Sequence, residues 1–430
     1  MSAETEPARA AADLLRGRST VTIMTAMSPQ EPHSAIRKLL AEARRFDIEV
    51  TLLTACIDGS LAYLTDEDVI SIRERRLHLV TLAGGVPRAL GALADSIPQS
   101  LWNIDRMLQD GTIACDIYVV RATATPEGGI DVGAAVAFTP TMLAQPAVQT
   151  IVELDATGPH GLCDDNLDWS RCLVWASDEL HGDEAASPEP AARAGSAADP
   201  AQVRIAEHVA QLVPEDATVQ LGIGSLADAI ATALRTGPSA GIHCGSVPGG
   251  VLMRIRQGEF ARATDHADAG LQIATSLAET PARSGHRVPD SVRLRPIGYT
   301  HDPEVLAGIP VLWAINSALS IDVRGQVNSE WISGARVASA GGLRDFTAGA
   351  QRSSGGGSVV ALPSRTRSGH SRILAMLEAP AAVSAGGHEV GYLVTEYGVA
   401  TLHGRTQAQR AESIIAIAHP DDRDALSRGV

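Results

Sequence analysis

Residues 217–235 read ATVQLGIGSLADAIATALR, and this stretch decides the fold. It begins with an apolar strand pattern that ends in the tight turn Gly222-Ile223-Gly224, and it continues with the apolar spacing of a helix. A strand, a glycine turn and a helix in succession are typical of a βαβ unit, in which the next strand runs parallel to the first. The stretch therefore predicts an α/β fold with a parallel sheet.

The same alternation extends over both halves of the chain. Residues 33–45 have the pattern of an amphipathic helix and lie between two strand patterns. The strand patterns cover residues 19–27, 47–55, 77–84, 114–122, 148–155, 311–319, 358–363 and 390–398. Because ligands of parallel sheets bind at the carboxyl ends of the strands, we expect the functional site in the loops that follow these strands.

A segment of different composition separates the two halves. Residues 177–200 are rich in Ala, Pro, Ser and acidic residues and lack apolar periodicity. This is typical of a flexible linker, and a long surface loop within one domain is the alternative. We expect an α/β domain over residues 1–180, a linker over 181–199 and a second α/β domain over 200–430, each with an open, largely parallel sheet.

The composition excludes several classes of partner. The 35 basic and 50 acidic residues give a net charge of −15, and aromatic residues make up 3% of the chain. Such a surface is poorly suited to neutralise phosphates or to stack bases, so we expect no nucleic-acid partner. The N-terminus lacks the apolar core of a signal peptide and no apolar run reaches 18 residues, so we expect a cytoplasmic protein with no membrane partner. The five cysteines form no CxxC pair, so we expect no metal site.

Two glycine-containing stretches are candidates for binding a ligand through the backbone. Gly222 and Gly224 open a helix, where N–H groups can approach a phosphate or an oxyanion; an ordinary tight turn is the alternative. Residues 339–364 predict either a loop that wraps a ligand or a mobile surface loop. The candidate glycines in this second stretch are Gly341, Gly342, Gly355, Gly356 and Gly357.

Longer segments resemble a known family. The segments are VQLGIGSLADAI, INSALSIDVRGQVNSE, GGLRDFTAGAQRSSGGGSVVALPSRTRSGHSRIL and TEYGVATLHGR, together with DGTIACDIYVVRATATPEGGIDVGAAVAFTP in the first half. They are similar to the acetyl-CoA hydrolase/transferase family, which contains the single-chain class I CoA-transferases such as 4-hydroxybutyrate CoA-transferase. The resemblance covers essentially the whole chain. It implies two α/β domains of related, CoA-transferase-like fold with a CoA thioester bound between them, and a homodimer.

The resemblance also implies roles for individual residues. It implies that coenzyme A, as the acyl-CoA substrate, binds at the glycines named above and near His370, with the backbone N–H of Gly398 close to the thioester carbonyl. Family members use a glutamate that attacks the acyl-CoA and becomes an anhydride and then a glutamyl-CoA thioester. That glutamate follows Asn-Ser-Ala-Leu, and here Ser320 stands in its place. A second family acid is also missing, because Gly245 follows His243-Cys244.

The substitution leaves several candidates for the chemistry. Ser320 is either a nucleophile, with His243, His370 or His403 as its base, or an inert residue that vacates space. Cys244 is either a thiolate nucleophile beside His243 or a small apolar residue of the core. Glu330 either replaces the missing acid or has an ordinary structural role.

Three functions follow from these candidates. The first is an acyl-CoA enzyme with altered chemistry, which transfers the acyl group to a small acceptor that is not a carboxylate, hydrolyses the thioester or decarboxylates the substrate. The second is an ordinary acyl-CoA:carboxylate CoA-transferase that uses another acid such as Glu330. The third is a non-catalytic acyl-CoA-binding protein. The intact glycine motifs favour the first two, and the missing glutamate favours the first.

Limited proteolysis tests the expected linker. We expect a protease to cut first within residues 177–200, because a segment without apolar periodicity has no core to protect it. Mass spectrometry of the first fragments identifies the cleavage sites. First cleavage elsewhere, with residues 177–200 intact, would contradict the linker.

Overall fold

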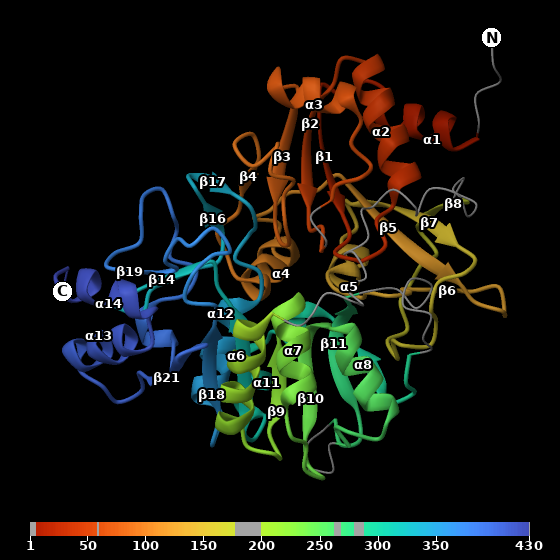
Figure 1. Cartoon of the computed structure of the whole chain (residues 1–430). Coiled ribbons are helices and arrows are strands. Elements are labelled where there is room, and N and C mark those ends of the chain that lie inside the picture. The colour runs from red at the N-terminus through yellow and green to blue at the C-terminus, as the bar shows by residue number, and fades with distance from the viewer. Residues whose placement is uncertain (1–5, 58–59, 177–198, 262–267, 279–287, 430) are drawn as a thin grey trace.

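The structure of the protein, a computed structural model, describes residues 6–57, 60–176, 199–261, 268–278 and 288–429. Two sheets of eight strands organise the chain, one in each half (Figure 1). The expected α/β fold with largely parallel sheets is confirmed. Most of the expected linker lies outside the described residues, so the domain boundaries stay predictions.

The N-terminal sheet has the strand order β4-β3-β2-β1-β5-β7-β8, with parallel pairs along this path and β6 antiparallel to β5. Alternate side chains of a strand point to opposite faces. Helices α1, α2 and α3 therefore cover one face and α4 and α5 the other. The bounds are β1 Thr20–Thr25, β2 Glu49–Thr54, β3 Leu77–Thr81, β4 Asp95–Ser96, β5 Ile117–Ala124, β6 Ile130–Asp131, β7 Gln149–Asp155, β8 Leu173–Ala176, α1 Glu6–Leu15, α2 His33–Arg45, α3 Asp66–Arg73, α4 Leu101–Gln109 and α5 Thr139–Leu143.

The C-terminal sheet has the order β12-β11-β10-β9-β13-β18-β20-β21, and only the pair β20–β21 is antiparallel. In both sheets the first strand lies centrally, the next three strands add on one side and later strands add on the other, as expected for two related folds. The strands are β9 Thr218–Leu221, β10 Gly241–Val247, β11 Gln272–Leu277, β12 Val292–Leu294, β13 Leu312–Ser317, β18 Gly357–Ala361, β20 Tyr392–Thr395 and β21 Gly398–Thr401. The helices are α6 Pro200–Leu212, α7 Ser225–Ala233, α8 Gly249–Arg256, α10 Ile297–Thr300, α11 Pro303–Gly308, α12 Leu343–Arg352, α13 Gln407–Ala416 and α14 Pro420–Ser427.

Two smaller sheets follow β13. The first has the order β15-β14-β19 and packs with α13 and α14, and the second is the hairpin β16–β17. Near the end of this region lies a short 3₁₀ helix, η2. The bounds are β14 Ser320–Asp322, β15 Val327–Asn328, β16 Trp331–Ile332, β17 Ala335–Arg336, β19 Ile373–Leu374 and η2 Gly387–Glu389.

The local structure corrects one expectation from the sequence. Residues 339–364 are not a loop, because most of them form α12 and β18. The five candidate glycines stand at the ends of these elements, whereas Leu343, Phe346 and Ala350 within α12 have helical spacing and are buried. Glycine-rich composition therefore hid an ordinary amphipathic helix.

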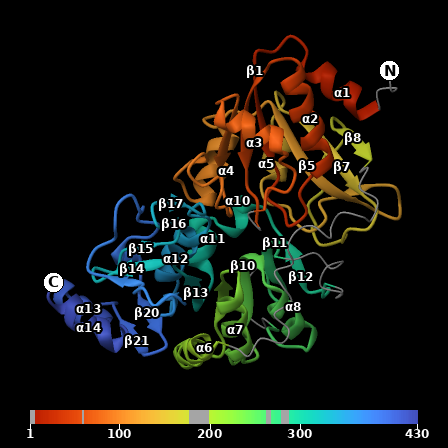
Figure 2. The ribbon, with the colours of Figure 1, turned by 45° about the horizontal axis from the view of Figure 1, so that its top comes forward.

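The two halves meet through loops at the carboxyl ends of their strands (Figures 1 and 2). Val136 N–H donates to the Thr275 carbonyl at 3.0 Å, and Leu277 N–H donates to the Ala134 carbonyl at 2.8 Å, both at the end of β11. At the end of β3, Ser339 Oγ donates to Thr81 Oγ1 at 2.8 Å. The carboxyl ends of both sheets therefore face one another.

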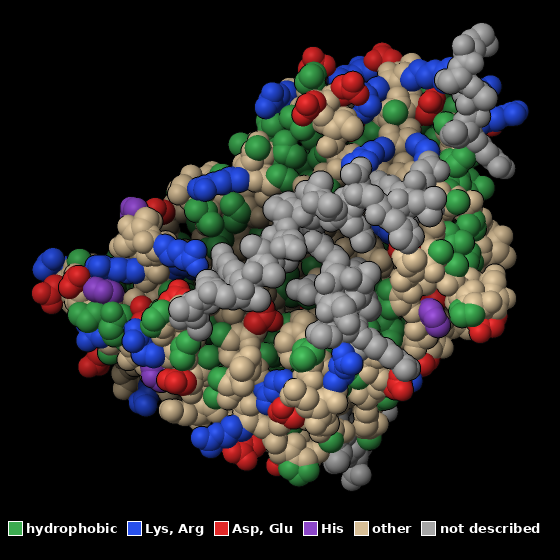
Figure 3. Space-filling model, turned by 45° about the vertical axis from the view of Figure 1, so that its right-hand side comes forward, with side chains coloured by type: hydrophobic (Ala, Val, Ile, Leu, Met, Phe, Trp, Pro, Cys, Tyr) green, Lys and Arg blue, Asp and Glu red, His purple; other side chains and the backbone are tan. Residues whose placement is uncertain are grey.

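On the face in Figure 3, acidic and basic side chains of the described residues are interspersed. Within the described residues, no helix combines the length and the apolarity needed to cross a membrane.

Asp345 of α12 links the two halves electrostatically. It accepts a hydrogen bond from Trp102 N–H at 3.3 Å, and it also accepts from Ser100 and Leu101 at the start of α4. Burial raises the pKa of the Asp345 carboxyl to about 6. Its ordinary value is about 3.9, so the folded state holds this proton more tightly than the unfolded state does.

This shift predicts a pH dependence that Asp345→Asn removes. The contribution of Asp345 to stability is complete below about pH 4 and is lost as the pH rises through about 6. The stability of Asp345→Asn relative to the unmodified protein should therefore rise over this window, by up to about 3 kcal/mol. Urea unfolding of both proteins between pH 4 and pH 7 measures the difference. Parallel profiles for the two proteins would show that Asp345 does not titrate as described.

Candidate active site

Three loops at the carboxyl edge of the C-terminal sheet carry four of the expected site residues, Gly222, Gly224, Ser320 and Gly398. The loops are residues 222–224 after β9, 318–320 after β13 and 396–398 after β20, and we call them the carboxyl-end loops. Strands β9, β13, β18 and β20 lie in this order and run parallel, so the three loops leave the same edge of the sheet. This edge faces the N-terminal half.

The first loop has the open backbone expected of an anion-binding turn. Gly224 has φ +107°, a conformation that glycine adopts without strain, and it lets β9 turn directly into α7. Gly222 N–H donates to the Ile315 carbonyl at 3.1 Å, which fixes the loop to β13. A β-carbon at Gly222 would have no neighbour closer than 3.8 Å. The first turn of α7 has no side-chain cap, so its N–H groups are available to a phosphate or an oxyanion.

Ser320 begins β14 and has one side-chain partner. Its Oγ accepts a hydrogen bond from Asn328 Nδ2 at 3.0 Å, and the same amide donates to the Trp331 carbonyl at 2.9 Å. Among the described residues, no histidine or carboxylate forms a hydrogen bond with Ser320. The structure therefore places no general base at this hydroxyl, although a nucleophilic serine requires one.

The three candidate histidines lie elsewhere. His243 is fully buried on β10, where its Nε2 lies 3.0 Å from the Thr300 carbonyl. His370 is exposed and its Nδ1 lies 3.0 Å from Ser368 Oγ. His403 is exposed after β21. These histidines lie within or near the family motifs in the sequence, but none of the three forms a hydrogen bond with Ser320 in the described structure.

Cys244 lies in the hydrophobic core and not at the surface of a site. Its side chain is fully buried, and burial raises the pKa of the thiol to about 12. A reactive cysteine needs a lowered pKa and access to substrate. The structure therefore favours the apolar interpretation of Cys244 over the thiolate interpretation.

Glu330 is also buried and already engaged. Its Oε1 accepts a hydrogen bond from Ser384 Oγ at 2.7 Å, and Ser384 Oγ in turn accepts from Ser329 N–H at 3.0 Å. A carboxylate held in this way orders the segment that precedes the β16–β17 hairpin. This geometry favours the structural interpretation of Glu330.

Gly355, Gly356 and Gly357 lie at the opposite edge of the sheet from the carboxyl-end loops. They connect α12 to the amino end of β18. A β-carbon at Gly356 would lie 2.3 Å from the Ala350 carbonyl oxygen and 2.7 Å from that of Leu312. These glycines are therefore required by the packing of α12 and β18 on β13, and we leave them out of the proposed site.

Gly341 and Gly342 precede α12, beside a histidine that the sequence did not indicate. His301 is fully buried, its Nδ1 lies 2.8 Å from Thr300 Oγ1, and burial lowers its pKa to about 3, so the ring is neutral. A β-carbon at Gly342 would lie 2.6 Å from His301 Nε2. Gly342 therefore has a packing role, whether or not it also contacts a ligand.

Gly398 belongs to the turn between β20 and β21. Its φ of +140° lies in the region that favours glycine. In the same turn, Glu396 accepts hydrogen bonds from Ser364 N–H at 2.8 Å and from Ser364 Oγ at 2.7 Å. Glu396 therefore orders the loops after β18 and β20.

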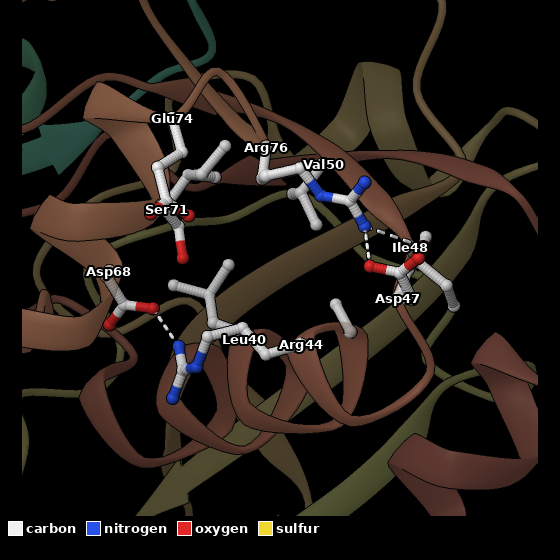
Figure 4. A pocket seen from close by; sticks show the side chains of 11 residues that line it. Leu40, Arg44, Asp47, Ile48, Val50, Asp68, Ser71, Glu74 and Arg76 are labelled. Atoms are coloured by element: carbon white, nitrogen blue, oxygen red, sulfur yellow. Dashed lines mark hydrogen bonds and ion pairs between the residues drawn. The ribbon is translucent and has the colours of Figure 1, made fainter.

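A pocket of about 180 Å³ lies in the N-terminal half, and residues 40–77 line it (Figure 4). It opens between α2 and α3, at the amino ends of β2 and β3. Two ion pairs lie between side chains that line the pocket, Arg44 with Asp68 and Arg76 with Asp47. Because parallel sheets bind ligands at the opposite edge, we do not assign the reaction to this pocket. In the part of the chain that the structure describes, no group of three His, Cys, Asp or Glu side chains could hold a metal ion.

Comparisons with known proteins define the class of the fold. RipA from Yersinia pestis has a TM-score of 0.82 at 24% identity, with 99% of this chain and 96% of that chain covered. A 4-hydroxybutyrate CoA-transferase from Porphyromonas gingivalis has a TM-score of 0.73 at 23% identity and the same coverage. The fold is therefore that of the CoA-transferases and RipA.

Sequence comparisons support the resemblance. Residues 286–430 match the model of the acetyl-CoA hydrolase/transferase C-terminal domain, which confirms the resemblance predicted from the sequence. The chain is 36% identical to 4-hydroxybutyrate coenzyme A transferase from Clostridium kluyveri over 229 residues, which is 52% of each protein, so the match spans about half the length of that relative. It is 28% identical to a succinyl-CoA:acetate/propanoyl-CoA:succinate CoA transferase from Fasciola hepatica, over 78% of this chain and 69% of that protein.

Two glycines of the site should respond differently to the same added methyl group. Gly342→Ala forces a β-carbon against the buried His301 ring, so we expect a loss of about 1–3 kcal/mol in the free energy of unfolding. Gly222→Ala meets no close neighbour, so we expect a change within about 0.5 kcal/mol but weaker binding of acyl-CoA. Urea unfolding and calorimetric titration measure the two effects. Equal destabilisation by both substitutions would show that the described packing is wrong.

Proposed function

We propose that the protein is an acyl-CoA-dependent enzyme that transfers the acyl group of a CoA thioester to water or to a small acceptor other than a carboxylate. Relatives of the chain are named CoA-transferases and an acetyl-CoA hydrolase, which supports acyl-CoA as the substrate class. The proposal of altered chemistry rests on the identity of residue 320, which is a serine. It occupies the position at which the family resemblance places the attacking glutamate, and its partner is the Asn328 amide.

In the proposed reaction the acceptor attacks the bound thioester directly. The acceptor oxygen or nitrogen forms a bond to the acyl carbon, the carbon–sulfur bond breaks, and the proton of the acceptor leaves with the CoA thiol. The tetrahedral intermediate carries a negative charge on oxygen, which backbone N–H groups of the carboxyl-end loops would stabilise. The protein then contributes binding, orientation and charge stabilisation, and no covalent enzyme intermediate forms.

The other mechanisms have less support. A serine nucleophile would need a base, and the hydrogen bond of Ser320 is to an amide. A CoA-transferase reaction through Glu330 would need a carboxylate that is free to attack, and the Glu330 carboxylate is buried and bonded to Ser384. Non-catalytic binding of acyl-CoA remains as an outcome of the test. We also propose that the protein is a homodimer, as the resemblance implies, and that it is cytoplasmic, as the sequence predicts. Sedimentation equilibrium measures the mass of the assembly.

Substitutions of Ser320 separate these mechanisms. Direct transfer predicts that Ser320→Ala keeps turnover within about threefold, because the hydroxyl forms no bond to the acyl group. It also predicts that the unmodified protein exchanges no labelled CoA between acyl-CoA and a free carboxylate. Ser320→Glu should gain weak exchange, since it restores a carboxylate nucleophile, and should lose the native reaction.

The readouts are CoA release and intact mass after incubation with a panel of acyl-CoAs. A CoA adduct on the unmodified protein, or efficient CoA exchange, would reinstate an ordinary CoA-transferase. An acyl adduct that Ser320→Ala abolishes would indicate a serine nucleophile. Binding without release of CoA from any thioester would indicate the non-catalytic protein.

A further inference from the structure

Gly245 stands on β10 where the family resemblance implies a second acid, and its surroundings are open to a small group. The residue is partly exposed, in the carboxyl-terminal half of the strand. A β-carbon on Gly245 would have as its nearest neighbours His301 Nε2 at 3.5 Å, His301 Cε1 at 3.7 Å and Phe346 Cε2 at 3.8 Å. These are ordinary van der Waals distances, so a group the size of a methyl fits here without displacing a neighbour.

His301 presents an unpaired nitrogen at this position. The side chain is fully buried, and its Nε2 has no hydrogen-bond partner in the described part of the chain. Its Nδ1 lies 2.8 Å from Thr300 Oγ1, whose own proton is directed to the Pro296 carbonyl at 3.3 Å. Nδ1 therefore donates to Thr300. Because a neutral imidazole carries one N–H, Nε2 is left as a hydrogen-bond acceptor.

Thr275 presents a hydroxyl from the neighbouring strand. The register between β10 and β11 pairs Cys244 with Ala274, so the next residues, Gly245 and Thr275, are level with one another. Level residues of adjacent strands lie about 5 Å apart and on the same face. Thr275 is fully buried, and no described residue forms a hydrogen bond with its Oγ1. We call the space bordered by Gly245, Thr275 and His301 the Gly245 niche.

The Gly245 niche lies next to one of the carboxyl-end loops, at the junction of the two halves. Strand β10 pairs with β9 in a register that, continued to the carboxyl edge, brings Gly245 level with Gly222. Helix α10, which leads into His301, begins at the junction, because Ile297 N–H donates to the Ala137 carbonyl of the N-terminal half at 3.1 Å (Figure 2). A group bound in the niche is therefore adjacent to the loop proposed to stabilise the oxyanion.

The two unpaired atoms complement one chemical group. His301 Nε2 requires a donor, and the Thr275 hydroxyl can donate to an acceptor. A neutral hydroxyl group supplies both, since it has one O–H and two lone pairs. A carboxylate has only acceptors and would set its lone pairs against that of Nε2, which leaves the nitrogen unsatisfied. An alkylammonium ion would bring an unpaired charge to two neutral, buried side chains, which is costly.

We propose that the Gly245 niche binds the hydroxyl group of the acyl acceptor, with His301 Nε2 accepting its hydrogen bond and Thr275 donating to its oxygen. The inference rests on the proposed function and names the chemical class of the acceptor: a small neutral hydroxyl compound, which is either a short alcohol or water. In the transfer step the hydroxyl oxygen bonds to the acyl carbon while the carbon–sulfur bond breaks. The hydroxyl proton passes by way of Nε2 to the CoA sulfur. His301 is then a catalytic residue that the sequence did not indicate.

The test measures products from the acyl-CoA of the panel that releases CoA fastest, with methanol and formate as added acceptors. An alcohol acceptor predicts a methyl ester whose share of the product rises with the methanol concentration. Water as the acceptor predicts the free acid alone at every methanol concentration. Both sources predict that formate does not accelerate CoA release, because a carboxylate does not match the niche.

Substitutions assign the reaction to the niche. Gly245→Ala places a methyl group in it, at distances and in a backbone conformation that alanine tolerates. Thr275→Val replaces the hydroxyl by a methyl group of similar size. Each should lower the rate of CoA release at least about tenfold, with the KM for acyl-CoA changed less than about twofold. His301→Phe should act in the same way, and Thr275→Ser keeps the hydroxyl and should keep the rate.

A matched control separates the niche from a general effect of an added methyl group. Gly308 is exposed at the end of α11, and a β-carbon on it would have no neighbour within 4 Å. Gly308→Ala should therefore leave the rate unchanged. Urea unfolding checks the fold of each variant. Gly245→Ala and Thr275→Val keep the proposal testable if His301→Phe does not fold.

The outcomes distinguish the inference from the proposed function. Rates of CoA release in Gly245→Ala and Thr275→Val that stay close to that of the unmodified protein would overturn the niche and leave the acyl-CoA function intact. Acceleration by formate equal to that by methanol would overturn the hydroxyl class. Absence of CoA release from every thioester of the panel would overturn the proposed function, and the acceptor site with it.

Discussion

Main-chain hydrogen bonds between loops at the carboxyl ends of two parallel sheets are the constraint on which the candidate site depends. Val136 N–H donates to the Thr275 carbonyl and Leu277 N–H donates to the Ala134 carbonyl at β11, and Ser339 N–H donates to the Gly84 carbonyl after β3. Where a helix follows a strand in such a fold, its N-terminus lies at the same edge, so partial positive charge accumulates there. This matters because the chain carries a net charge of −15 and repels an anionic ligand overall. Attraction for acyl-CoA must therefore come from local N–H groups and individual arginines.

The sequence was sufficient for the elements that depend on periodicity. The helix over residues 33–45 and the strand, turn and helix over residues 217–235 form because their apolar spacing is regular and their glycines stand at the turns. It was misleading over residues 339–364, where glycines at both ends of α12 concealed the helix between them. Composition describes a window of sequence, whereas a helix depends on the order of residues within that window.

The site was predictable only where its residues are adjacent in sequence. The motif around Ser320 is enough to predict that serine stands in place of the family's glutamate. Thr275 is brought level with Gly245 only by the register between β10 and β11. His301 meets Gly342 through the packing of α12, which no motif describes. Cys244 and Glu330 were attractive by residue type, but their burial and partners depend on the complete fold.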